Sequence, residues 1–194
     1  MKQADDVLAY WLDEVGPDKW YRADEDLDDD IRAQFGTTWD LCQQGACGLW
    51  LTDPAGALAY VILTDQFSRN MFRGDARAFA TDKMARAAAK LAIDRDWDRA
   101  ISEPARQFFY MPLTHSENLI DQDRAVRLIH ARLPETGGST LEHARVHRSI
   151  IRTYGRFPYR NAILGRAMTQ AEQGFMDDGG YGAVLRAHMA AQKG

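Results

Sequence analysis

Apolar residues recur along this chain every three or four positions, which is the period of an amphipathic helix. Alternating runs of β-branched residues, the pattern of a half-buried strand, never extend over six positions. The pattern therefore predicts an all-α fold in which short links join antiparallel helical hairpins into a bundle or a short solenoid. The expected helices cover residues 4–13, 28–44, 54–72, 76–94, 103–111, 117–133, 140–154 and 170–177.

Local signals mark the ends of these helices. Asp53 followed by Pro54 is typical of an N-cap and the first helical position. The spacing of a capping box occurs at Thr114–Glu117, Ser139–Glu142 and Thr169–Glu172. No linker rich in Pro, Gly and Ser interrupts the series, so residues 1–194 are expected to form a single helical domain. Glycines predict the helix ends: Gly36, Gly45, Gly74, Gly137, Gly138 and Gly155.

Composition narrows the class of protein mainly by exclusion. A chain of 194 residues with 45% hydrophobic and 27% charged residues can bury about 70% of its unfolded surface, so it needs no metal or disulfide to fold. The sequence lacks a long apolar span and has no signal-peptide core near Met1, which predicts a cytoplasmic protein with no membrane association. Two cysteines, Cys42 and Cys47, are too few for a disulfide framework or a zinc site.

Charge is distributed unevenly. Residues 1–53 carry a net charge of −9 and residues 54–194 carry +5, which gives −4 for the chain. This acidic balance argues against nucleic acid as a partner. The acidic run at residues 24–30 is open to two interpretations, a metal or partner site and the first turn of a helix. The second is favoured because acidic side chains stabilise a helix N-terminus, and the run lacks the Gly and closing Glu of a calcium loop.

An acidic and a basic residue fall within the apolar stripe of the helix expected at 54–72. On a helical projection, Asp65 and Arg69 lie in the middle of the stripe formed by Val61, Phe72, Leu58 and Ile62. Burying these charges is costly unless they are paired and hydrogen-bonded. One interpretation is a buried ion pair that holds neighbouring helices. The other is a stripe that runs into a polar pocket, to which three more side chains would contribute: Gln66, Asn70 and Arg73.

The helix expected at 140–154 repeats this observation with histidines. His143 and His147 lie one turn apart inside the apolar stripe, with the spacing of two zinc ligands on a helix. The Glu of a His-Glu-x-x-His motif is absent, so we expect no metal. A histidine on a core-facing stripe is more often a hydrogen-bonded structural residue than a ligand. Three arginines on the opposite face are expected to be solvated: Arg145, Arg148 and Arg152.

Two further segments carry candidate binding residues. The loop after this helix contains Arg156, Arg160, Asn161 and Arg166, and no acidic residue lies between positions 145 and 166. Its guanidinium groups suit a carboxylate or phosphate ligand, or alternatively they cap helix C-termini and pair with the acidic N-terminal segment. In the second segment, His115 and Glu117 would suit proton transfer, unless Glu117 serves only the capping box.

Three motifs in these segments resemble a known family. They are Asp65–Gly74 (DQFSRNMFRG), Met111–Glu117 (MPLTHSE) and His147–Arg166 (HRSIIRTYGRFPYRNAILGR). In sequence and order they resemble the signature segments of the bacterial domain-of-unknown-function 924 family, over about residues 5–178. The resemblance implies an all-α fold similar to tetratricopeptide-like hairpins and implies no reaction. Tyr159 stands where many members have His, which removes the natural acid–base residue of that loop.

Two functions follow from these observations. The first is a buried polar pocket that binds a small anionic ligand, with hydrolysis as the reaction class if the protein is an enzyme, and with no cofactor. The second is a tetratricopeptide-like scaffold for a peptide or protein, which would require exposed aromatic residues among Trp11, Trp20, Trp39, Trp50 and Trp97. The polar residues within apolar stripes favour the pocket. Its predicted ligand-binding residues are Asp65, Gln66, Arg69, Asn70, Arg73, His115, Glu117, His147, Arg156, Arg160, Asn161 and Arg166.

Overall fold

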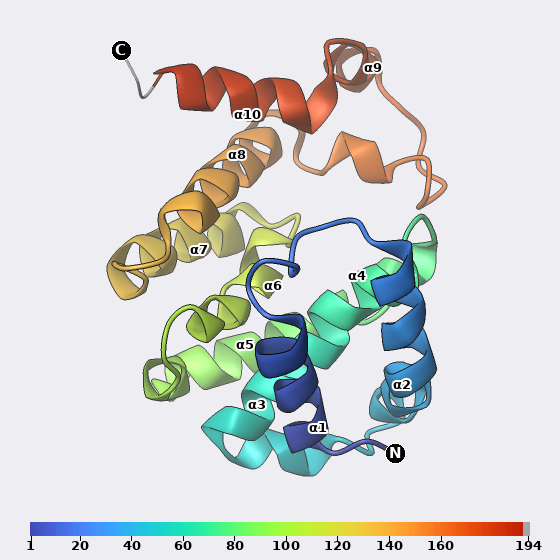
Figure 1. The fold of residues 1–194 in the computed structure, drawn as a ribbon. Coiled ribbons are helices and arrows are strands. Elements are labelled where there is room, and N and C mark those ends of the chain that lie inside the picture. The colour runs from blue at the N-terminus through green and yellow to red at the C-terminus, as the bar shows by residue number, and fades with distance from the viewer. Residues whose placement is uncertain (192–194) are drawn as a thin grey trace. The chain divides into compact units, whose positions relative to one another are not determined.

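The computed structural model describes residues 1–191, which form helices joined by turns and contain no strand (Figure 1). This confirms the all-α fold expected from the periodicity. Contacts divide the chain into two units, Met1–Pro112 and Leu113–Gly194. Among the described residues, no helix has both the length and the apolar character needed to cross a bilayer.

The first unit consists of helices joined by short connections. It contains five α-helices, two π-helices and several short 3₁₀ turns. The π-helices directly extend α1 and α3. The α- and π-elements in chain order are α1 (Ala4–Leu8), η1 (Ala9–Val15), α2 (Glu25–Gln43), α3 (Pro54–Val61), η3 (Ile62–Phe67), α4 (Ser68–Met71) and α5 (Asp82–Asp94). The 3₁₀ turns are η2 (Gly48–Thr52), η4 (Ala76–Phe79), η5 (Trp97–Ala100) and η6 (Ala105–Phe109), and α6 (Met111–Thr114) spans the boundary between the units.

One continuous helical segment, α3–η3–α4, passes through the core of the first unit. It begins as predicted, because Asp53 Oδ1 accepts the amide hydrogens of Ala55 and Gly56 at 3.0 Å each and Pro54 occupies the first turn. Gly56 permits close contact with the preceding 3₁₀ turn, since a Cβ there would lie 2.3 Å from the Trp50 carbonyl oxygen. The segment is thereby anchored at its start and carries Asp65 in its π-helical turn.

Aromatic side chains fill the core around this segment. The Phe67 ring packs against Phe35 and Trp11, with centroid distances of 4.8 and 5.3 Å. The exposed fractions of four tryptophans are 0% for Trp11, 5% for Trp20, 4% for Trp39 and 7% for Trp50. These four are therefore core residues and do not supply the exposed aromatic surface that the scaffold interpretation requires.

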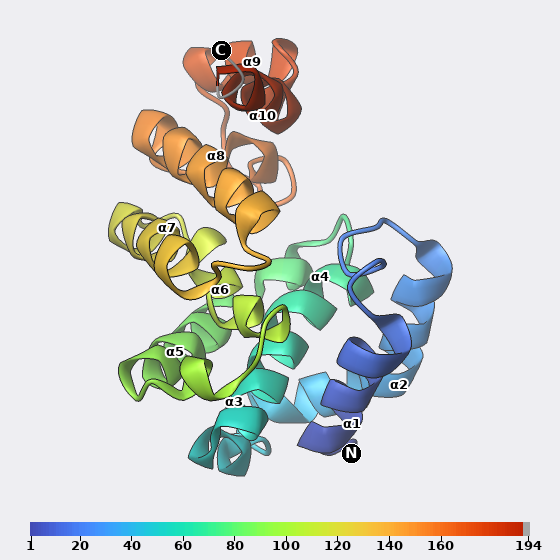
Figure 2. The same ribbon diagram turned by 60° about the vertical axis from the view of Figure 1, so that its left-hand side comes forward.

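The second unit is built on a helical hairpin. Helices α7 (Leu119–Arg132) and α8 (Gly138–Tyr154) lie side by side in both views (Figure 1 and Figure 2). The 3₁₀ turn η7 (Pro158–Arg160) and helix α9 (Gln170–Asp177) follow. Helix α10 (Gly180–Ala191), which the sequence pattern did not predict, packs on α8 and α9. One buried hydrophobic cluster of this unit consists of Val146, Ile150, Ile151, Phe157 and Phe175.

Several predicted boundaries in the first unit need correction. Helix α2 begins at Glu25, three residues before the expected start, because Asp24 accepts the Leu27 amide hydrogen as N-cap. Gly36 does not end this helix but lies inside it. The helix expected at 76–94 is broken into η4 and α5, and the segment at 103–111 forms a 3₁₀ turn rather than an α-helix.

In the second unit, one of three predicted capping boxes is present. Thr169 and Glu172 form it at the start of α9, as expected. The box at Thr114–Glu117 is wrong, because α7 starts at Leu119 and Asn118 accepts the Ile120 amide hydrogen. The box at Ser139–Glu142 is also wrong, since α8 starts after Gly137 without a side-chain cap. In both incorrect cases the glutamate contacts side chains instead: Arg166 for Glu117, and Arg145 and His188 for Glu142.

Candidate functional site

The loop that follows α8 is the centre of the candidate site in the second unit. Gly155 ends the helix as predicted, with a left-handed φ of 71° that most side chains would strain. Phe157 then adopts an extended conformation, and Pro158 starts the short turn η7. This local sequence turns the chain so that the arginines of residues 156–166 face other parts of the same unit.

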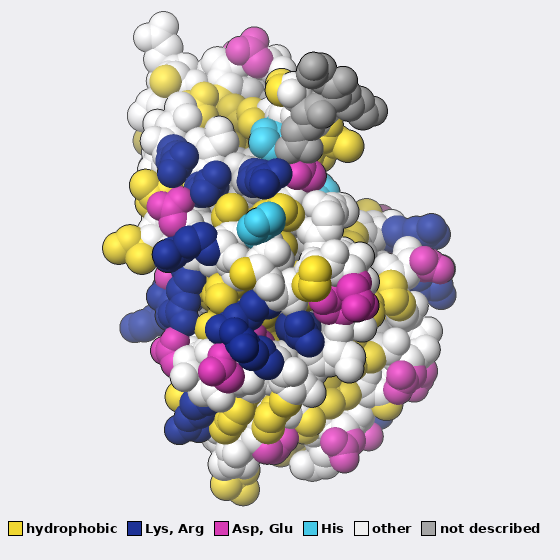
Figure 3. Space-filling view, turned by 90° about the vertical axis from the view of Figure 1, so that its left-hand side faces the viewer, with side chains coloured by type: hydrophobic (Ala, Val, Ile, Leu, Met, Phe, Trp, Pro, Cys, Tyr) yellow, Lys and Arg dark blue, Asp and Glu magenta, His cyan; other side chains and the backbone are white. Residues whose placement is uncertain are grey.

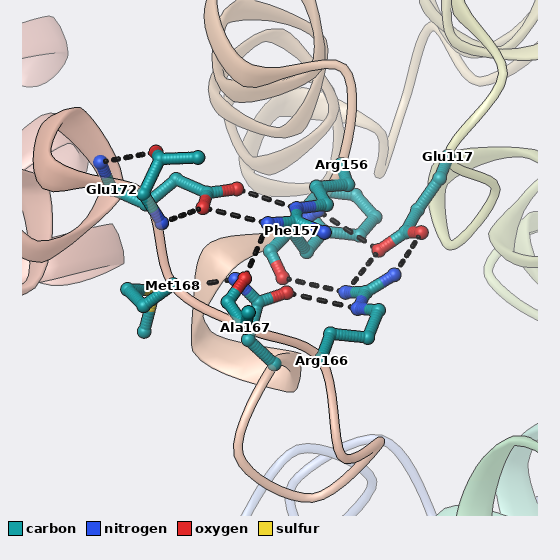
Figure 4. Close-up of polar contacts among 9 residues, drawn as sticks. Glu117, Arg156, Phe157, Arg166, Ala167, Met168 and Glu172 are labelled. Atoms are coloured by element: carbon teal, nitrogen blue, oxygen red, sulfur yellow. Dashed lines mark hydrogen bonds and ion pairs between the residues drawn. The ribbon is translucent and has the colours of Figure 1, made fainter.

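Glu117 and Arg166 form the first fixed contact of this loop (Figure 4). Arg166 donates two parallel hydrogen bonds to the Glu117 carboxylate, NH1 to Oε2 at 2.7 Å and NH2 to Oε1 at 3.0 Å. The Phe157 amide also donates to Glu117 Oε1 at 2.9 Å. Burial raises the pKa of Glu117, but these hydrogen bonds and the charges of Arg166 and Arg160 outweigh it and lower the pKa overall. Glu117 is therefore an ionised anchor for the loop.

A second carboxylate holds the other end of the loop. Arg156 donates to Glu172 from Nε to Oε1 at 2.5 Å and from NH2 to Oε2 at 2.7 Å (Figure 4). Glu172 also accepts the Thr169 amide hydrogen at 2.8 Å as part of the capping box. The hydrogen bonds from Arg156 and Thr169 hold the pKa of Glu172 far below its usual range. Arg156 and Arg166 thus pair with carboxylates of their own unit.

Asn161 and Arg160 complete the inner side of the loop. Asn161 is fully buried and accepts a hydrogen bond from Arg166 Nε at 2.9 Å. Arg160 is only 8% exposed. Its guanidinium carbon lies 4.4 Å from the centroid of the Phe157 ring, and its NH1 donates to the His115 carbonyl oxygen at 3.1 Å. A buried guanidinium is thereby fixed beside the backbone of His115.

Two histidine rings lie next to each other in the same unit. The centroid of His115 is 6.2 Å from that of His147, which comes from α8. The His147 ring also packs against Phe157 and Tyr181, at 5.2 Å in each case. Both histidines are half-buried, and Nδ1 of His147 is shielded from solvent. His115, His147 and Arg160 form what we call the histidine–arginine cluster.

Residues that the sequence analysis did not select support this cluster. Gln122, fully buried on α7, donates from Nε2 to the carbonyl oxygens of Thr114 and Ser116 at 2.7 Å each. These carbonyls flank His115, so Gln122 fixes the backbone that carries it. Tyr181 covers His147 and hydrogen-bonds to His143. Burial raises the pKa of Tyr181 to about 12 and lowers the pKa of His143.

The predicted residues of the first unit fall into two networks. Asp65 is fully buried, as expected, and its Oδ1 lies 3.0 Å from Arg69 NH1. Gln66 donates to the same carboxylate, and Arg69 NH2 lies 2.9 Å from Asp82 at the start of α5. The second network surrounds a buried carboxylate on α2, with Asp28 accepting from Asn70 at 2.7 Å and from Arg73 at 2.6 and 2.9 Å.

The contacts of Asp65 and Arg69 agree with the interpretation of these two charges as a buried ion pair. In the first unit, the Asp65–Arg69 pair exists and extends to Asp82, which was not among the predicted residues. Asp82 is the first residue of α5, a position where acidic residues are common, and this pattern could have indicated it. Among residues 1–191, no group of three or more His, Cys, Asp and Glu side chains is arranged to hold a metal ion.

Comparisons with known proteins agree with the resemblance seen in the sequence. The model of the family described as "Bacterial protein of unknown function (DUF924)" matches residues 7–180. The chain is similar to a solved structure, "Structure of Protein of Unknown Function ATU0120 from Agrobacterium tumefaciens", with 39% identity and a TM-score of 0.85 over 91% of this chain and 97% of that one. No curated protein matches the chain. The chain therefore belongs to the DUF924 family of bacterial proteins.

Proposed function

We propose that this protein binds a small anionic ligand at the histidine–arginine cluster of its second unit. The observation that carries the proposal is the placement of two half-buried imidazole rings 6.2 Å apart, beside a guanidinium that is fixed to the His115 carbonyl. Imidazole and guanidinium groups donate hydrogen bonds to carboxylate and phosphate oxygens. The rings of Phe157 and Tyr181 that pack against His147 make its surroundings less polar, which would strengthen such bonds.

The charge of the surrounding groups supports an anionic ligand. Arg156, Arg160 and Arg166 carry three positive charges, whereas Glu117 and Glu172 carry two negative charges. The group has a net charge of +1 before either histidine is protonated. Because Arg156 and Arg166 hold carboxylates of the chain, we assign them to anchoring the loop and assign anion contact to Arg160. Ligand binding by the polar residues of the first unit, Asp65 to Arg73, is separate from this site and stays a prediction of the sequence.

If the protein is a hydrolase, the residues of the histidine–arginine cluster and Glu117 would have different roles. A histidine of the cluster would take a proton from the attacking water, and Arg160 would stabilise the negative charge that develops on the substrate. Glu117 is not suited to be the acid, because its lowered pKa keeps it ionised near neutral pH. Its role is to position the loop that carries Phe157 and Arg160.

Anion titrations of histidine variants test the proposal. Inorganic phosphate and malonate should shift the imidazole proton resonances of His115 and His147. The His147→Ala variant should bind the shifting anion about tenfold more weakly, the loss of one hydrogen bond to a charged group. His130→Ala is the matched control, because His130 lies exposed on α7 of the same unit. Equal loss in both variants, or no shift with either anion, would refute the site.

The reaction class needs its own assay. Turnover of p-nitrophenyl phosphate and p-nitrophenyl acetate should be measurable in the natural protein and in His130→Ala, and should be lost in His147→Ala and His115→Ala. Arg160→Lys keeps the charge but removes the planar donor group, so it should retain folding and lose most of the turnover. Binding without turnover in all these proteins would leave a binding protein and contradict the hydrolase assignment.

A further inference from the structure

A second group of arginines lies on the outer face of the α7–α8 hairpin. Arg148 and Arg152 on α8 both contact the same oxygen of Asp123 on α7, each at 3.4 Å. Arg127, one turn further along α7, donates from Nε to the Asp123 carbonyl oxygen at 3.3 Å. We call these four residues the Asp123 arginine patch. Figure 3 looks onto this side and shows Lys and Arg side chains gathered over these helices.

The patch has more positive charge than its own acidic residue can neutralise. Two guanidinium groups contact the Asp123 carboxylate and a third, that of Arg127, contacts the Asp123 backbone carbonyl, so the four residues have a net charge of +2. The ion pairs are long, and the exposed fractions are 56% for Arg152 and 40% for Asp123. Exposed ion pairs of this kind contribute little to stability, so the arginines can change partners at low cost. By contrast, the neighbouring Arg145 is paired with Glu142 at 2.9 Å.

We propose that the Asp123 arginine patch docks an acidic segment of a partner protein. Arg148 and Arg152 are four residues apart on one helix, so they present positive charges about 6 Å apart along its axis. Carboxylates at successive turns of an acidic helix have the same spacing, which permits paired contacts. A protein partner fits better than a nucleic acid, because the chain has a net charge of −4, whereas protein domains that bind nucleic acid are usually strongly basic.

This inference is independent of the proposed ligand site. The patch uses the face of α8 that carries Arg148 and Arg152, whereas His147 packs against Phe157 and Tyr181. Asp123 plays a specific part, because it competes with the partner's carboxylates for the same guanidinium groups. Removing the Asp123 charge should therefore strengthen docking. If the peptide responded only to the net charge of the protein, removing any other exposed carboxylate would have the same effect.

Fluorescence anisotropy with labelled peptides tests the docking surface. A fluorescein-labelled oligoglutamate peptide should bind the natural protein at low salt, and an uncharged Gly-Ser peptide should not. The Arg148→Gln/Arg152→Gln double variant should bind about tenfold more weakly, and Asp123→Asn about threefold more tightly, as expected for one or two charges at an exposed site. Circular dichroism of each variant checks that the fold is unchanged.

Matched controls separate a local effect from a change in net charge. Arg95→Gln/Arg99→Gln removes two arginines, both exposed, and Arg99 pairs with Asp96 at the same distance of 3.4 Å. Asp178→Asn removes an exposed carboxylate from the second unit, like Asp123→Asn. Control variants that change affinity as much as the patch variants would overturn the proposal. So would tighter binding of a single-stranded oligonucleotide than of oligoglutamate, or a self-association that Arg148→Gln/Arg152→Gln abolishes.

Discussion

Replacing Arg69 by Ala tests whether the buried charges of the first unit are structural. In the folded protein, Arg69 bridges two carboxylates, Asp65 at 3.0 Å and Asp82 at 2.9 Å. The Asp65 side chain is only 1% exposed and Arg69 is 21% exposed, so solvent screens the bridge weakly. The variant would remove this guanidinium from a carboxylate inside the core, and a loss of this kind costs about 3–5 kcal/mol in comparable buried pairs.

Urea unfolding measures this loss directly. For a chain of this size the free energy of unfolding falls by about 2 kcal/mol per molar urea, so a loss of about 4 kcal/mol moves the midpoint by roughly 2 M. Asp82→Asn should lose less than Arg69→Ala, because Asp82 is 18% exposed and Arg69 would keep its contact with Asp65. Arg99→Ala is the surface control, since its pair with Asp96 is more than 60% exposed, and it should change stability by less than about 0.5 kcal/mol.

The outcome also decides between the two interpretations of the Asp65–Arg69 pair. A loss of less than about 1 kcal/mol in Arg69→Ala would refute the structural interpretation, because a buried bridge cannot be removed so cheaply. If anion binding fell in that variant at the same time, Arg69 would be a ligand contact, as the sequence analysis allows. A large loss of stability with unchanged anion binding would assign Arg69 to the core alone.

Three further predictions rest on local geometry. Gly56→Ala should destabilise the protein by about 1–3 kcal/mol in a thermal or urea melt, because the added Cβ would overlap the Trp50 carbonyl. Gly36→Ala is the control: its Cβ would meet nothing within 4 Å, so it should stabilise α2 by about 0.5–1 kcal/mol. Equal effects of the two substitutions would contradict the packing argument. Asp53→Ala should cost about 1 kcal/mol by removing the N-cap of α3, measurable in the same melts. The lowered pKa of Glu117 means that its ionised form stabilises the fold above the unfolded pKa of about 4.3, and this contribution disappears as pH falls through the folded pKa. The stability difference between the natural protein and Glu117→Gln should therefore shrink below about pH 4.3, and a difference independent of pH would refute this.

Features encoded by neighbouring residues could be predicted from the sequence. The N-cap at Asp53, the capping box of Thr169 and Glu172, and the left-handed end of α8 at Gly155 all formed as expected. Each depends on hydrogen bonds or backbone conformations within a few residues, so the local sequence is sufficient. The burial of Asp65 also followed from helical periodicity alone, because the periodicity identifies which face of a helix enters the core.

Contacts between distant residues could not be predicted in the same way. For Glu117 the sequence left proton transfer and a capping box open, but Arg166, 49 residues away, holds its carboxylate. A bidentate ion pair is stronger than a capping hydrogen bond, so the distant partner prevails where the fold brings it close. Helix α10 was missed for a related reason, because it begins at Gly180 in a glycine-rich segment and is held by packing on α8 and α9.

The candidate site shows the same division. Residue types that suit an anion were identified from their pattern, including His115, His147 and Arg160. Tertiary structure decided which arginines pair with carboxylates of the chain. Arg156 lies in the loop after α8, whereas its partner Glu172 lies on α9. The sequence by itself thus determined most of the helices and the chemical types available. Packing in three dimensions determined which of these charged groups pair with one another, because ion pairing depends on distance in space rather than along the chain.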